Sequence, residues 1–197
     1  MVEQKLFGIT FGVSVGFMSL ITFMLYVDKT GLMLPTAIAT FLHEWGHILI
    51  LLAFRCKIEK ISFRLGSVAV QGCYSLSTLK EALMLLAGPV ANLLFFGVCY
   101  FALATTNNLI WLNYGLVSLV IAIINLLPIQ GLDGGNLLLI FISQFLDLKN
   151  TDLVLKGVSF LACAVIILFG LYIFIFQRKN PSVIIFGIYL LIYTFKT

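Results

Sequence analysis

Two histidines stand four residues apart in the segment His43-Glu44-Trp45-Gly46-His47, and the sequence contains no others. On a helix this spacing puts both imidazoles on one face, one turn apart, where they can bind the same metal ion. Glu44 follows the first histidine directly, so its carboxylate can reach a water on that metal without being a ligand, which suits a general base. A lone histidine in an apolar segment would be read as a hydrogen-bonded packing residue, but this pair with its glutamate predicts a metal site.

A catalytic zinc ion usually has three protein ligands and an open position for water, so a third ligand must come from elsewhere in the chain. Ionisable groups inside a membrane segment cost roughly 2.5 kcal/mol or more and usually mark function. Of the eight acidic residues, Glu44 and Asp133 alone fall within apolar segments rather than in termini, loops or helix ends. We therefore expect one Zn²⁺ per chain, held by His43, His47 and Asp133, with Glu44 as the catalytic base.

The segment that carries Asp133 reads Asn125-Leu-Leu-Pro128-Ile-Gln-Gly131-Leu-Asp133-Gly134-Gly135. Pro128 is expected to end the preceding helix, and the glycines are expected to release the backbone from helical geometry. A broken segment at membrane depth is tolerated where it is buried in protein or lines a wet cavity. This pattern favours a functional role for the segment.

The elements that must position these residues lie in a strongly apolar chain. Of its 197 residues 61% are hydrophobic and 10% are charged, and the mean hydropathy is +1.13. Because about 20 apolar residues cross a bilayer as a helix, we predict an all-α polytopic membrane protein with about six spans in a single domain, residues 1–197. The first span is read as retained, since no cleavage site follows it. The predicted spans are residues 6–26, 32–54, 83–104, 109–127, 154–176 and 183–195.

Lysines and arginines in the connections set the orientation, because cytoplasmic loops carry the excess of positive charge. A cytoplasmic N-terminus puts nine of the twelve inside and leaves Lys29, Arg178 and Lys179 outside. Both termini are then expected in the cytoplasm, and the metal site roughly 10 Å from the cytoplasmic end of the second span. Anionic lipid explains the net charge of +4, so we expect a lipid partner and no nucleic acid.

Between the second and third spans, Ile61, Phe63 and Leu65 alternate with Ser62 and Arg64, and Gly66-Ser67 precede another apolar run. This pattern predicts a small β-hairpin over residues 58–74. Its free edge, at Val70, could pair with an unwound substrate segment. The alternative is an amphipathic hairpin that rests on the membrane surface.

The four cysteines, Cys56, Cys73, Cys99 and Cys163, show no CxxC pairing and no ladder of spacings. We expect free thiols. Cys99 and Cys163 lie within predicted spans and are expected to be small packing residues.

The motifs together resemble those of the site-2 protease family of intramembrane zinc metalloproteases. The resemblance rests on His43-Glu44-x-x-His47, Gly88-Pro89-Val-Ala-Asn92, and Asn125-x-x-Pro128 followed by Leu132-Asp133-Gly134-Gly135. It covers about residues 41–136. The six-span layout looks most like the subgroup that contains the bacterial sporulation protease of pro-sigma-factor maturation. We expect neither the CBS domain of that subgroup nor the PDZ domains of other branches.

This resemblance implies that His43, His47 and Asp133 bind zinc and that Glu44 activates water. It also implies that a transmembrane or membrane-associated protein, such as a membrane-tethered regulator, is cut near the cytoplasmic side, in what is expected to be a bacterial cytoplasmic membrane. Asn125 is expected to contact substrate or the developing oxyanion, with helix capping as its alternative role. Asn92 is expected to pack or hydrogen-bond, and Gly88 to permit close helix contact.

Two other classes of protein compete with a protease: a non-enzymatic membrane protein, such as a metal transporter or a scaffold, and a membrane metal oxidase or desaturase. A metal transporter should repeat polar ligands along a path through the membrane, whereas here they gather at one depth. A scaffold without catalysis would usually have lost Glu44, which is present. A membrane di-iron oxidase or desaturase needs many histidine ligands, and two are too few.

Overall fold

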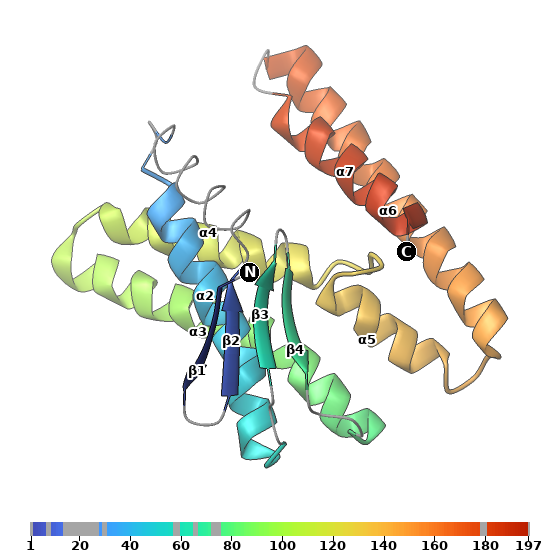
Figure 1. Ribbon diagram of the computed structural model, residues 1–197. Helices are drawn as coiled ribbons and strands as arrows, with labels where there is room; N and C mark the ends of the chain where they lie inside the picture. The colour runs from blue at the N-terminus through green and yellow to red at the C-terminus, as the bar shows by residue number, and fades with distance from the viewer. Residues whose placement is uncertain are drawn as a thin grey trace. The chain divides into compact units, whose positions relative to one another are not determined.

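Figure 1 shows the computed structural model, which describes residues 2–6, 9–13, 28, 31–56, 60–64, 67–71, 76–177 and 181–196. The chain divides into two compact units, Met1–Ala122 and Ile123–Thr197. Each unit is described in its own frame below.

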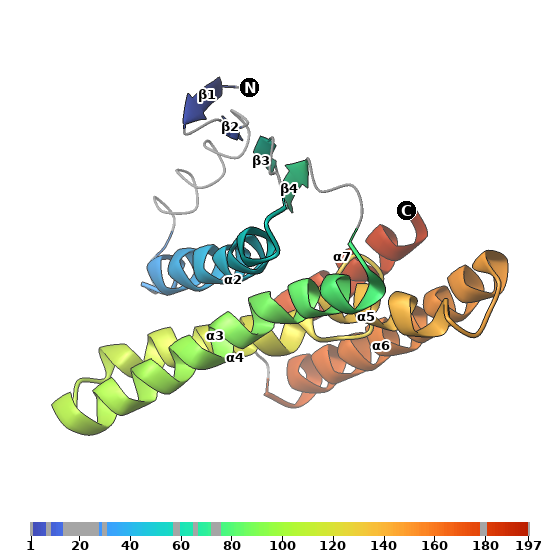
Figure 2. The same ribbon diagram turned by 90° about the horizontal axis from the view of Figure 1, so that it is seen from below.

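Three helices build most of the first unit: α2 (Met33–Ala53), α3 (Thr78–Thr106) and α4 (Ile110–Asn125), whose last turn runs into the second unit. The carboxylate of Asp28 starts α2 by accepting hydrogen bonds from the backbone N–H groups of Gly31 and Met33, at 3.0 and 2.9 Å. It thereby satisfies an amide that the helix itself leaves without a partner. Figure 1 shows α2 crossing α3, and Figure 2 shows the two helices beside each other.

The α2–α3 contact is close because small residues meet there. Gly46 of α2 faces the backbone of Ala87 on α3, and a Cβ added at Gly46 would lie 2.9 Å from the Ala87 carbonyl carbon and 3.0 Å from the Cβ of Ala91. Small residues at such crossings let two helix backbones approach within a membrane. The approach brings the histidines of α2 against the side of α3.

A four-stranded sheet with strand order β1-β2-β3-β4 completes the described part of the first unit. The strands are β1 (Val2–Leu6), β2 (Ile9–Val13), β3 (Lys60–Arg64) and β4 (Ser67–Gln71). β1 and β2 are antiparallel, β2 and β3 parallel, and β3 and β4 antiparallel with Ile61 opposite Val70. The last pair lies inside the range expected for the hairpin, whose residues 58–59, 65–66 and 72–74 are outside the described residues.

The expectation of a helical span beginning at Leu6 is wrong at its start, because Ile9–Val13 form β2. Residues 14–26 of that predicted span lie outside the described residues. The sequence Ile9-Thr10-Phe11-Gly12-Val13 is rich in β-branched and aromatic residues, which favour strands, and glycine disfavours a helix interior. The apolar content alone concealed this preference. The rest of the described fold is helical, as expected, with six helices in addition to the sheet.

The second unit contains α5 (Asp133–Ile142), α6 (Leu148–Gln177) and α7 (Ser182–Lys196). In Figure 1, α6 and α7 form an antiparallel pair in orange and red. Ile129, from the connector before α5, packs against Cys163 of α6 and Leu190 of α7, and all three are buried. The connector is therefore held against this helix pair.

Three of the described helices are long and apolar enough to cross a membrane: Met33–Ala53, Thr78–Thr106 and Leu148–Phe176. They correspond to the predicted second, third and fifth spans, and the first of them is one residue shorter at each end than the predicted 32–54. The predicted fourth and sixth spans correspond to α4 and α7, which are apolar but have 16 and 15 residues. Helix α5 was not predicted as a helix.

Large apolar side chains lie on the outside of these helices and several polar side chains lie inside. Leu94, Phe101 and Leu161 are exposed, whereas Asn92, Ser118 and Ser159 are fully buried. Water would disfavour so large an apolar surface, and hydrocarbon would not. This distribution, together with the three long apolar helices, points to a membrane protein.

The cysteines only partly match the expectation of free thiols. Cys99 and Cys163 are free and buried, in keeping with a packing role. Cys56, two residues beyond the C-cap of α2, is disulfide-bonded. A disulfide can join residues far apart in sequence, so the lack of a CxxC spacing gave no signal for it.

Candidate metal centre

The imidazoles of His43 and His47 meet on one face of α2, as their spacing predicts. Their ring centroids are 4.8 Å apart with the planes at 85°, and the two Nε2 atoms lie 3.2 Å from each other. His43 is buried and His47 is half-buried. The two nitrogens therefore face a shared point in the protein interior.

The distance between these nitrogens fits a metal ion. Two nitrogen ligands at 2.0–2.1 Å from a tetrahedral zinc would lie about 3.3 Å apart. The observed separation of 3.2 Å agrees with this value without any movement of either ring. Imidazole nitrogens are also the donors that zinc binds most often together with carboxylates and thiolates.

His47 is fixed in the tautomer that metal ligation needs. Its Nδ1 donates a hydrogen bond to the backbone carbonyl of Met84 on α3, at 2.7 Å. A carbonyl oxygen can only accept, so Nδ1 carries a proton, and in the neutral ring the lone pair is then on Nε2.

Gly88 provides the space for both rings. A Cβ at this position would collide with Nε2 of His47 and would lie 2.6 Å from its Cε1 and 2.8 Å from Cε1 of His43. Any residue larger than glycine would have to displace the imidazoles. The contact that Gly88 permits is therefore with the imidazole rings of His43 and His47.

Asn92 contacts the other histidine. Its Nδ2 lies 3.3 Å from Nδ1 of His43, and its backbone carbonyl accepts a 2.9 Å hydrogen bond from Ser118 Oγ on α4. Met84, Gly88 and Asn92 are four residues apart, so they follow one face of α3. Sequence reasoning anticipated a hydrogen bond from Asn92 but not its partner, and it missed Met84, whose carbonyl carries no side-chain signal.

Glu44 lies next to His43 on α2 and is half-buried. A carboxylate in such a place can take up and release protons beside a metal without being one of its ligands. Trp45 is exposed and lies against Phe41, with ring centroids 5.8 Å apart. The exposed side of α2 beside His43 and Glu44 therefore carries aromatic side chains.

Asn125 and Asp133 belong to the second unit. Asn125 ends α4, and Asp133 is the first residue of α5, where a carboxylate is stabilised by the positive end of the helix dipole. The expectation that Gly134 and Gly135 break helical geometry is wrong, because both are inside α5. Both glycines instead let the start of α5 pack closely against the connector before it. A Cβ at Gly134 would collide with the carbonyl of Leu126, and a Cβ at Gly135 with the carbonyl of Ile129.

The connector from Leu126 to Leu132 is fixed at several points. Gly131 has a φ of +91°, which other residues rarely adopt, and it faces the ring of Tyr193. The backbone N–H of Gln130 donates a 2.9 Å hydrogen bond to Ser159 Oγ, next to the buried Ile129. Asp133 therefore follows a segment with a defined path over α6 and α7.

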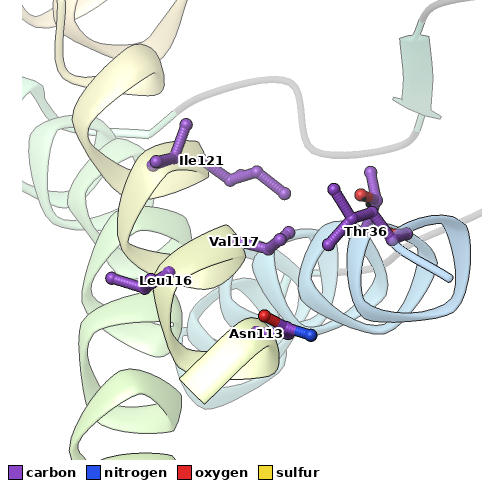
Figure 3. A pocket seen from close by; sticks show the side chains of 7 residues that line it. Thr36, Asn113, Leu116, Val117 and Ile121 are labelled. Atoms are coloured by element: carbon purple, nitrogen blue, oxygen red, sulfur yellow. Dashed lines mark hydrogen bonds between the residues drawn. The ribbon is translucent and has the colours of Figure 1, made fainter. Parts of the chain in front are cut away.

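A cavity of about 490 Å³ lies apart from the histidines in the first unit. Figure 3 shows residues of α2 and α4 that line it. Thr36 in its wall precedes His43 by seven residues, about 10 Å along the helix. The lining has no ionisable side chain, so it offers neither metal ligands nor acid–base groups. Its lining residues are Leu32, Thr36, Asn113, Leu116, Val117, Val120 and Ile121.

Comparisons with known proteins bear on the fold. No family model and no curated protein matches the chain. Among solved structures, the chain is similar to the site-2 protease from Methanocaldococcus jannaschii, with a TM-score of 0.68 and 18% sequence identity. The similarity covers 99% of this chain and 94% of that one. The chain therefore has the fold of that protein.

Proposed function

We propose that this chain is an intramembrane zinc metalloprotease that hydrolyses peptide bonds of transmembrane or membrane-associated proteins. The observation that carries the proposal is the pair His43 and His47, with Nε2 atoms 3.2 Å apart on an apolar helix and Glu44 beside them. The fold, shared with a site-2 protease, supports it further. Ionisable groups in such a helix are energetically costly, so their presence usually marks a functional site.

Asp133 is proposed as the third zinc ligand. Two imidazoles and a carboxylate are a known donor set for hydrolytic zinc, and they leave one position open for water. The fixed connector before α5 supports this role, because a ligand must be held in place before the metal binds. The chemistry that zinc supplies when bound is Lewis acidity toward water and toward the substrate carbonyl.

Glu44 is proposed as the proton carrier. Its carboxylate takes a proton from the attacking water as the water oxygen bonds to the scissile carbonyl carbon. The same carboxyl group then gives that proton to the amide nitrogen, the C–N bond breaks, and a carboxylate and an amine leave. Asn125 is proposed to donate its side-chain N–H to the oxyanion that develops on the carbonyl oxygen.

The substrate is proposed to add as a strand to β4. A transmembrane helix hides its peptide bonds, so it must unwind before hydrolysis, and an extended segment can pair with an exposed sheet edge. β4 is the last strand in the sheet order, and Val70 lies within it. Cleavage is proposed near the cytoplasmic side, with both termini of this multi-pass protein in the cytoplasm and a membrane-tethered regulator as the type of substrate.

The test is co-expression of the chain with a panel of candidate single-span regulators, comparing wild type with Glu44→Gln. Wild type should contain one zinc ion and cleave at least one regulator, and Glu44→Gln should keep the zinc and lose about 10²- to 10⁴-fold in rate. A variant that keeps its zinc and cleaves as fast as wild type would overturn the mechanism. A wild-type protein without zinc would overturn the proposal as a whole.

A further inference from the structure

Each histidine of the pair needs a partner for the ring nitrogen that faces away from the metal. A histidine that binds zinc through Nε2 carries its proton on Nδ1 and donates it to an acceptor, which fixes the ring and strengthens the ligand. For His47 the acceptor is the Met84 carbonyl. For His43 the group next to Nδ1 is the side chain of Asn92, 3.3 Å away.

The carboxamide of Asn92 offers both kinds of group. Its oxygen and nitrogen have nearly the same shape, and the hydrogen-bond network decides which one faces a neighbour. Oδ1 is buried and makes no hydrogen bond within the described residues. A half turn of the amide would therefore bring an acceptor to His43 without breaking a bond that Oδ1 already makes.

We infer that Asn92 is a positioning residue for the metal centre: its Oδ1 accepts the Nδ1 proton of His43 and aims the Nε2 lone pair of that ring at the zinc. The inference rests on the proposed zinc site and assigns to Asn92 the role that Met84 has for His47. One face of α3 then serves both ligands, with a carbonyl at position 84, space at Gly88 and an amide oxygen at position 92.

The position of Asn92 is also held by contacts that do not involve His43. Its side chain is fully buried, and its backbone carbonyl accepts the hydrogen bond from the buried Ser118 of α4. This bond does not involve the carboxamide. A change at Ser118 thus perturbs the packing around Asn92 but leaves the proposed bond to His43 in place, which makes it a matched control.

The experiment measures zinc affinity on the full-length protein in detergent, by competition with a chromophoric chelator, so no substrate is needed. Asn92→Leu keeps a similar volume but removes the acceptor, and it should weaken zinc binding by about 10- to 100-fold. Asn92→Asp keeps an acceptor and removes the N–H donors, and it should bind zinc at least as tightly as wild type. Ser118→Ala should match wild type.

A spectroscopic measurement separates this role from simple packing. The chain has two histidines, so the ¹⁵N spectrum of the zinc-loaded protein contains two imidazoles. Wild type should show two Nδ1–H protons protected from solvent exchange, and Asn92→Leu should lose protection at His43 and keep it at His47. Equal protection in both proteins would overturn the inference.

The affinities give two further outcomes that count against it. If Asn92→Asp binds zinc ten times more weakly than wild type, the amide N–H rather than the oxygen matters. If Ser118→Ala weakens binding as much as Asn92→Leu, helix packing explains the effect. A wild-type protein that binds zinc while the variants fail these expectations would leave the proposed function intact, whereas a wild type without zinc would remove both.

Discussion

Nδ1 of His47 and the carbonyl oxygen of Met84 lie 2.7 Å apart, so a proposed zinc ligand on α2 is held by the backbone of α3. Because the acceptor is a main-chain atom, no substitution at position 84 removes it directly. The orientation of His47 depends instead on how closely the two helices approach each other. Metal affinity should therefore respond to changes in the α2–α3 contact as well as to changes in the ligands.

Removal of a proposed ligand should abolish zinc binding. His43→Ala, His47→Ala and Asp133→Asn should each lower the zinc content of the purified protein from about one per chain to near zero, measured by mass spectrometry of the metal. Asp147→Asn is the control, because that carboxylate is exposed and was not proposed as a ligand. Full zinc content in Asp133→Asn would show that the third ligand is another group.

Gly88→Ala should displace the imidazoles. The new methyl group would collide with His47 and crowd His43, at a cost of about 1–3 kcal/mol for an overpacked site. We expect zinc affinity to fall by more than tenfold. Gly97→Ala is the control on the same helix, because nothing lies within 4 Å of its added Cβ. Alanine is the better helix former by up to about 1 kcal/mol, so this variant should be at least as stable as wild type. Equal zinc affinity in the two variants would contradict the close approach.

Val70→Pro should slow the cleavage of an intact membrane substrate, because proline removes a backbone N–H and disfavours strand pairing. Its zinc content should stay at the wild-type value. Val70→Ala keeps the backbone N–H and is the matched control. Unchanged cleavage of the intact substrate by Val70→Pro would remove the proposed role of the β4 edge.

The side of the membrane on which Cys56 lies can be measured. Loop charges predict a cytoplasmic position, whereas its disulfide bond is typical of an oxidising compartment. We predict the cytoplasmic side, because the loop lysines and arginines divide nine to three. After addition of a reductant, a membrane-impermeant maleimide should modify Cys56 in inverted vesicles and not in intact cells, as read by peptide mass. Modification from outside, after addition of a reductant, would invert the proposed topology.

The approach of His43 and His47 on α2 could be predicted from the sequence because its signal is local. His43 and His47 are one helical turn apart whatever surrounds them, so their meeting needed no knowledge of tertiary structure. Their partners are not local. The Met84 carbonyl has no side-chain identity, and the pairing of Asn92 with His43 depends on how α2 and α3 cross.

Element boundaries failed where hydropathy was the sole guide. α6 begins at Leu148 rather than near residue 154, because Lys149 and Asp152 are polar but good or tolerated helix residues at an exposed end. α5 was missed because two glycines open it, and their low helix propensity concealed the packing that requires them. The strand at Ile9–Val13 was read as part of a span because apolar content does not distinguish the two.

Helix α3 presents a carbonyl, a space and an amide at positions 84, 88 and 92, in register with the histidines. Inserting one residue ahead of Met84 would turn this face by about 100° and leave the hydropathy of the helix almost unchanged. The proposed centre therefore depends on how α3 is rotated about its own axis, since that rotation decides which residues face the histidines. A comparison of related sequences by composition would not detect the loss of this arrangement. A comparison of the spacing between positions 84, 88 and 92 would detect it.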